Sequence, residues 1–207
     1  SGEGKVTMVP EIALLDLGIE VEAATVEAAQ QQAREAMERV MKVLKSEGVA
    51  ERDIKTQSFS ISPVYSVVRE DTRQWEITGY RVSNRVSAKI REIDNVGSII
   101  DAAAKAGGDV ARIDSLSFTV DDPSKYYDEA REKALLDAMA RAKQIAKVAD
   151  IRLGKPLYIS ESTGYIPLPR PAEFRTAVPE AGAALSTPIS PGETEVRLTV
   201  QMAFGIK

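Results

Sequence analysis

The clearest pattern in the chain is an alternation of apolar and polar side chains between residues 77 and 91. Successive side chains of a strand point to opposite faces, so the alternation predicts a long strand with one buried face and one basic, solvent-facing side. The apolar positions are Tyr80, Val82, Val86, Ala88 and Ile90. The basic positions are Arg81, Arg85, Lys89 and Arg91. Asn84 interrupts the apolar face; we interpret it as a buried amide that bonds to the backbone, with a polar site residue as the alternative.

Two other stretches predict strands that extend this one. Residues 5–21 alternate, and Pro10 indicates an edge or a bulge because it cannot donate to a ladder. Residues 54–68 alternate as well, and the polar turn at 69–76 joins them to residues 77–91 as a long hairpin. Trp75 lies near the tip, where it either contacts a partner or packs across the hairpin. The apolar face of the first hairpin strand is expected to hold Phe59, Ile61, Tyr65 and Val67.

Apolar side chains at three- and four-residue steps predict helices. Thr25 is placed to cap the first, which runs to about Ser46 and ends before Gly48. Asp94 is expected to cap a short second helix that ends at a pair of glycines, at positions 107 and 108. A strand follows near residues 110–120.

A third helix is predicted to begin at Asp122 and Pro123, a capping residue followed by a proline whose missing N–H does no harm there. It runs to about Asp150. Its Ala-rich stripe, which would lie close against a sheet, comprises Ala134, Ala138, Ala142, Ile145 and Ala149. A short strand near 157–160 and a closing strand at 195–206 follow. The inward face of the closing strand is expected to hold Val196, Leu198, Val200, Met202, Phe204 and Ile206.

An internal echo indicates how these elements are ordered. Residues 53–62 resemble residues 112–121, and each stretch follows a helix that ends in glycine. A doubled strand–helix–strand unit, ferredoxin-like in order, explains the echo; chance and shared strand chemistry are the alternative. The predicted fold is α+β, a mostly antiparallel sheet with about three helices on one face, plus an extra helix and a closing strand.

We expect one domain over residues 1–207, with sub-lobes at 1–91 and 92–207. Six prolines fall within residues 163–192. This proline-rich arm is too long for a passive connection in a compact domain.

The composition excludes several classes of site. The 207 residues include no cysteine and no histidine, so disulfides, thiol nucleophiles, Cys-type zinc sites and histidine bases are absent. No apolar run approaches the roughly 18 residues of a membrane helix. The net charge of −4 argues against a dedicated nucleic-acid binder. The chain opens on Ser1 without an initiator Met, so a targeting segment is expected to have been removed. We predict no catalytic, metal or cofactor residues and no cofactor.

Candidate interaction residues remain. The row formed by Arg81, Arg85, Lys89 and Arg91 either binds phosphate or acidic partners or pairs with acids on neighbouring strands. The favoured interpretation is the second. A pocket beneath the proline-rich arm is another candidate, and the polar groups near it in sequence are Tyr158, Glu161, Tyr165 and Arg170.

Several motifs together resemble one known family. The opening GEGKVTMVPEIALLDLGIE, the stretch GVAERDIKTQSFSISPVY from residue 48, the stretch ITGYRVSNRVSAKIREIDNVGSIIDAAAKAG from residue 77, and the stretch DEAREKALLDAMARAKQIAKVADIRLGKPLYISES from residue 128 are similar to the SIMPL domain family. The proline-rich arm before the last strand is also typical of that family. Asp150 and Ile151 stand where the family often has Gly-Val.

The resemblance implies a periplasmic or secreted protein. Some members of this family, which includes the bacterial periplasmic immunogenic proteins, are linked to oxidative stress. At least one assembles into a ring-like oligomer, and no catalytic residues carry over. Our leading hypothesis is a non-enzymatic extracytoplasmic homo-oligomer, without nucleic acid and without a transmembrane segment, that could associate peripherally with the envelope. The alternative is a small-ligand-binding protein or weak hydrolase, whose ligand the sequence does not specify.

Overall fold

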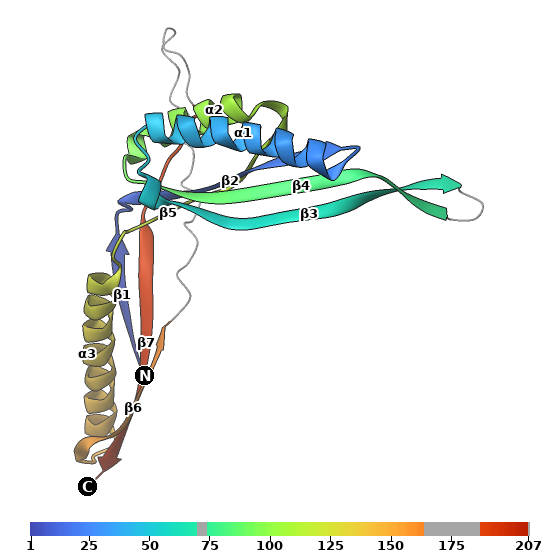
Figure 1. Ribbon diagram of the computed structural model, residues 1–207. Helices are drawn as coiled ribbons and strands as arrows, with labels where there is room; N and C mark the ends of the chain where they lie inside the picture. The colour runs from blue at the N-terminus through green and yellow to red at the C-terminus, as the bar shows by residue number, and fades with distance from the viewer. Residues whose placement is uncertain (70–73, 164–186, 207) are drawn as a thin grey trace. The chain divides into compact units, whose positions relative to one another are not determined.

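The computed structural model describes residues 1–69, 74–163 and 187–206 (Figure 1). The described residues form two compact units. The first unit comprises residues 1–10, 119–163 and 191–206, and the second comprises residues 11–69, 74–118 and 187–190. Each unit has its own sheet and its own hydrophobic core. The expectation of one domain over residues 1–207 stays a prediction.

The second unit contains the doubled motif that the sequence echo predicted. Its elements are β2 (Ile12–Ala23), α1 (Val26–Ser46), β3 (Ile54–Arg69), β4 (Gln74–Ile90), α2 (Val96–Gly107) and β5 (Ala111–Thr119). The strands lie in the order β3-β4-β2-β5, so each strand–helix–strand repeat contributes one central and one edge strand. This is the ferredoxin-like order, and the α+β prediction is confirmed. Short 3₁₀ turns lie at Glu51–Asp53, Ile93–Asn95 and Gly108–Val110.

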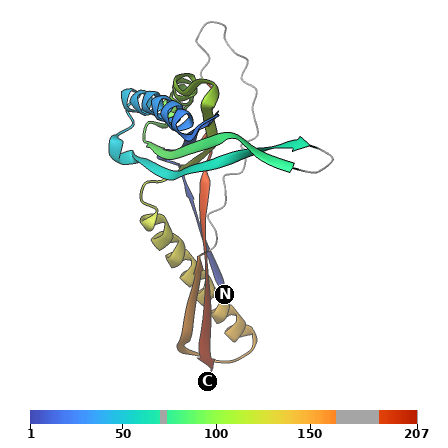
Figure 2. The same ribbon diagram turned by 45° about the vertical axis from the view of Figure 1, so that its right-hand side comes forward.

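Both helices of this unit cover the same face of its sheet (Figures 1 and 2). The Thr25 side chain accepts a 3.2 Å hydrogen bond from the Ala28 N–H, as an N-cap should, and Gly48 follows the helix with a positive φ of 90°. The predicted strand at residues 77–91 is β4, and its apolar face is buried against the helices. The largest fully buried side chains of this core include Leu15, Leu17, Ile19, Val40, Leu44, Val82, Ile90 and Ile99.

The first unit is a three-stranded sheet with one helix. Its elements are β1 (Gly2–Met8), α3 (Ser124–Val148), β6 (Leu153–Thr163) and β7 (Thr194–Ile206), and the strand order is β1-β7-β6. The helix lies almost in backbone contact with β1. A methyl group at Gly4 would come within 1.8 Å of the Ala130 carbonyl oxygen, and one at Gly2 within 2.2 Å of the Ala134 oxygen. Small side chains on both elements therefore set this distance.

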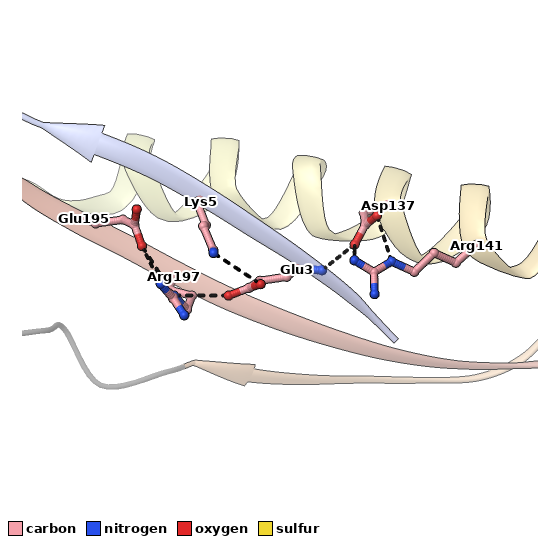
Figure 3. Close-up of polar contacts among 6 residues, drawn as sticks. All are labelled: Glu3, Lys5, Asp137, Arg141, Glu195 and Arg197. Carbon is pink, nitrogen blue, oxygen red and sulfur yellow. Dashed lines mark hydrogen bonds and ion pairs between the residues drawn. The ribbon is translucent and has the colours of Figure 1, made fainter.

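A polar network on the first unit joins β1 to both of its neighbours (Figure 3). The backbone N–H of Glu3 donates to Asp137 on α3 over 2.9 Å, and the Glu3 carboxylate lies 3.1 Å from Arg197 on β7. Arg141 pairs with Asp137 one helical turn away. The Glu3 N–H, followed by Arg141, lowers the pKa of Asp137, so the carboxylate is held in its charged form.

The structure corrects several details of the sequence interpretation. The strand expected at residues 5–21 is two strands in different sheets, because Pro10 lies in the break between β1 and β2 and cannot continue a ladder. The three helices consequently do not share one face: α1 and α2 lie on the four-stranded sheet, and α3 lies on the three-stranded one. Asp94 does not cap α2, since it belongs to the 3₁₀ turn and Asn95 precedes the helix.

The C-terminal ends of α3 and β7 are less buried than their apolar patterns indicated. Ile145 is 66% exposed and Ile206 is 68% exposed, and Ala149 is exposed as well. The buried positions of α3 are Ala130, Ala134, Ala138 and Ala146. These positions are four residues apart, except for the last two, which are eight apart. A helix has 3.6 residues per turn, so a stripe with this spacing turns gradually around the helix axis. Ile145 and Ala149 therefore lie outside the buried stripe.

Candidate functional site

The basic row of β4 lies on the sheet face opposite the helices, where its arginines meet acids from neighbouring elements. Arg81 pairs with Glu22, its register partner on β2. Arg85 lies 3.1 Å from Asp114 on β5, and the Arg91 guanidinium donates twice to Asp53, over 2.9 and 3.0 Å. The Arg91 hydrogen bond is the main cause of a lowered pKa at Asp53, and the charge of Lys89 adds to it. The hydrogen bond to Glu22 raises the pKa of Arg81.

Gly18 makes one of these pairs possible. It stands on β2, which lies between β4 and β5, so the Arg85 side chain must cross β2 to reach Asp114. A methyl group at Gly18 would lie 2.9 Å from the Arg85 Cγ and 2.7 Å from the Asn84 carbonyl oxygen. The acids thus compensate much of the positive charge of the row, and the arrangement favours a paired, solvated face over a phosphate-binding one.

The β3–β4 hairpin carries an apolar surface that the described residues of the second unit leave largely exposed. The hairpin runs well past the first turn of α1 (Figures 1 and 2). Tyr65 stands opposite Ile77 in register, so both lie on one face, and Trp75 shares it two residues further on. Their side chains are 53%, 50% and 62% exposed, respectively. We name Tyr65, Trp75 and Ile77, together with Ile61 on the same face of β3, the hairpin patch.

A groove lies between α1 and the two hairpin strands, with a volume of about 690 Å³. The apolar side chains that line it are Ala33, Met37 and Met41 from α1 and Phe59 from β3. Asn84 from β4 completes the lining, opposite Phe59 in register. The polar side chains along its mouth are Glu27, Gln30, Gln31, Arg34 and Glu38.

Asn84 differs from its favoured interpretation. Its Oδ1 atom is buried but has no hydrogen-bond partner among the residues that the structure describes. Buried polar atoms are nearly always paired, so this acceptor needs an explanation. The sequence contained the signal, a polar residue on an apolar face, but could not place Asn84 in one groove with Ala33 and Met37. That juxtaposition depends on which strands α1 covers.

The residues expected near the proline-rich arm are not brought together by the described structure. Tyr158 is exposed on β6, and Glu161 is bound by Arg131 of α3 over 2.6 Å. Tyr165 and Arg170 lie outside the described residues. Residues 187–190 of the arm belong to the second unit, where Thr187 donates its N–H and its hydroxyl to Asp101 of α2, over 3.0 and 2.6 Å. Ile189 packs against the core there.

The described ranges contain no group of three or more acidic residues that could hold a metal ion. Within the same ranges, every helix is too short or too polar to cross a bilayer. The candidate features are therefore the hairpin patch, the paired basic row and the groove with Asn84.

Comparison with known proteins relates the chain to one protein family. A family model described as "SIMPL: Protein of unknown function (DUF541)" matches residues 1–204. The chain is 34% identical over 212 residues to the 26 kDa periplasmic immunogenic protein of Brucella melitensis, an alignment that covers 100% of this chain and 83% of that protein. It is 32% identical over 158 residues to the uncharacterized protein YggE of Escherichia coli K12, over 76% of this chain and 62% of that protein.

These names indicate no enzymatic role, and the Brucella relative bears out the expected periplasmic location. The motifs of the opening strands, the hairpin, α2 and α3 predicted the same relationship. The chain belongs to the SIMPL family.

Proposed function

We propose that this chain is a non-enzymatic periplasmic protein that self-associates, and that the hairpin patch is the contact between copies. The observation that carries the proposal is the exposure of Tyr65, Trp75 and Ile77 on one face of a projecting hairpin. Adjoining apolar side chains of this size are unusual on the surface of a protein that acts alone, and aromatic residues are common at the centres of interfaces.

The marginal stability of a lone hairpin supports the same conclusion. Two strands that project from a sheet have few partners, and an isolated two-stranded hairpin is barely stable in water. β3 is in addition an edge strand of 16 residues, with unpaired backbone groups along one side. A second copy would cover the patch and stabilise the hairpin at once.

The first unit offers additional apolar surface. Ile145 and Val148 at the end of α3, Leu157 on β6 and Ile206 at the end of β7 are all exposed. These side chains could form a second contact, which an assembly of more than two copies requires unless the hairpin contact is itself head-to-tail. A role in envelope or oxidative stress stays a prediction from the family resemblance.

The test is the mass of the protein in solution. Trp75→Ser combined with Ile77→Ser removes two anchors of the patch. We expect the dissociation constant to rise by a factor of about 30 or more, which corresponds to the roughly 2 kcal/mol that a hot spot contributes. Sedimentation velocity over a range of micromolar concentrations measures it. The matched control is Ser66→Ala with Glu76→Gln, a register pair on the opposite face of the same hairpin.

The control should assemble like the unmodified chain. A mass that is the same for the patch variant and the control would show that copies meet elsewhere. An unmodified chain that remains a monomer at micromolar concentration would remove the proposal altogether.

A further inference from the structure

We propose that the groove between α1, β3 and β4 is a binding site for a small, uncharged molecule with an apolar body and one hydrogen-bond donor. The molecule would lie along Met37, Met41 and Phe59 and donate to the Asn84 Oδ1 atom. The site is distinct from the hairpin patch and does not depend on self-association.

The size and lining of the groove fit a small molecule. Its volume of about 690 Å³ falls in the range of roughly 300–1,000 Å³ that ligand pockets occupy. Two methionines and a phenylalanine form an apolar wall, and methionine adapts its shape to different ligands. Phe59 is 56% exposed although it lies on the apolar face of its strand, so a ligand would cover a side chain that the protein leaves in contact with water.

Asn84 specifies the polar part of the ligand. A buried acceptor without a partner destabilises the folded state, and a residue of similar shape without polar atoms, such as leucine, would avoid this. Asn84 lines the groove, but its Oδ1 atom has almost no surface open to water, so a donor in the groove reaches this atom once a flexible lining side chain moves aside. A hydroxyl or an N–H group of a bound molecule would satisfy it, whereas an ether oxygen would not.

The charges at the mouth indicate an uncharged ligand. Glu27 and Glu38 carry negative charge there, and Arg34 carries the single positive charge among the lining residues. An anion would meet two carboxylates, and a cation would lose its hydration against an apolar wall. The lining therefore gives neither ion an advantage.

Two probes that share a naphthalene ring test this inference on the complete chain. 1-Naphthol carries one hydroxyl donor, and 1-methoxynaphthalene replaces it with an acceptor. Measured by equilibrium dialysis, 1-naphthol should bind about tenfold more tightly or better, although the methoxy compound is the more hydrophobic of the two. In Asn84→Leu the preference should disappear, because the acceptor is gone and the apolar wall remains.

A second pair of variants locates the site independently. Gln30→Trp places a large side chain on the groove lining and should weaken both probes. Gln32→Trp is the matched control, since Gln32 is an exposed residue of α1 outside the lining, and it should leave binding unchanged.

Three kinds of result would overturn the inference. The first is the absence of saturable binding of either probe. The second is a naphthol preference that survives in Asn84→Leu, or binding that Gln30→Trp and Gln32→Trp affect equally. The third is binding that appears only when the protein is diluted to its smallest species, which would make the groove an interface between copies.

Discussion

Two carboxylates in this protein accept hydrogen bonds from backbone N–H groups that are distant in the sequence. Asp137 accepts from Glu3, 134 residues away, and Asp101 accepts from Thr187. In both cases the hydrogen bonds come first among the causes that lower the pKa of the carboxyl group. A carboxylate that bonds to backbone in the folded state is favoured in its charged form, so folding and ionisation are linked.

The free energy of unfolding should therefore depend on pH through Asp137. Its folded-state pKa lies below the ordinary value of 3.8, so its contribution is complete above that pH and is lost as the pH falls below 3.8 through the folded-state pKa. We expect Asp137→Asn to reduce the free energy of unfolding at about pH 7 and to make much less difference at about pH 2. Urea denaturation at both pH values measures this difference.

Glu132→Gln, at an exposed position of the same helix, serves as the control for losing one negative charge. An Asp137→Asn variant that loses as much stability at about pH 2 as at about pH 7 would mean that the carboxylate charge is irrelevant to this contact.

The residues also show what a sequence can and cannot predict. The alternation around Val82 and the cap at Thr25 are local patterns, and both predictions are confirmed. The pairing of Arg85 with Asp114 could not be predicted in this way, because it depends on Gly18 being the residue that stands between them on β2. Side chains 29 residues apart become neighbours only through strand order, which local pattern does not contain.

At the scale of elements, the spacing between α3 and β1 depends on the absence of side chains. Gly2 and Gly4 on the strand face Ala130, Ala134 and Ala138 on the helix. The predicted Ala-rich stripe indicated close packing, but the glycine partners lie at the other end of the chain. Sequence spacing gave no reason to connect them.

Gly4→Ala tests this packing. Its methyl group would overlap the Ala130 carbonyl oxygen, so the helix and strand must separate, and we expect a loss of about 1–3 kcal/mol in the free energy of unfolding. Thr7→Ala, at an exposed position of the same strand, should change stability by less than about 0.5 kcal/mol. Chemical denaturation compares the two, and equal losses would show that α3 can move away freely.

The hairpin is the element whose prediction was only partly confirmed. Its two strands lie where the alternation placed them, but the face with Phe59, Ile61 and Tyr65 is exposed rather than buried. Alternation identifies a face that is apolar and does not say whether the chain itself covers it. Val67 belongs to the same predicted face, but its side chain lies outside what the structure describes.

At the scale of the whole molecule, the internal echo proved the most informative pattern. It predicted the order of six elements in the second unit, because a repeated strand–helix–strand unit has few ways to form one sheet. The first unit was harder to predict, since its strands come from opposite ends of the chain and Pro10 separates β1 from β2. Within this architecture, we assign contact between copies to the hairpin and ligand binding to the groove.

Trp75 reports directly on self-association through the hairpin patch, because it is the single tryptophan of the chain. Its side chain is 62% exposed in the isolated chain, so a quencher in solution reaches it easily. Acrylamide quenching of its fluorescence, recorded together with light-scattering mass over a concentration series, is the measurement. If the hairpin patch is the contact between copies, quenching falls as the mass rises. A mass that rises while Trp75 stays equally accessible would contradict it, as would a monomer at every micromolar concentration.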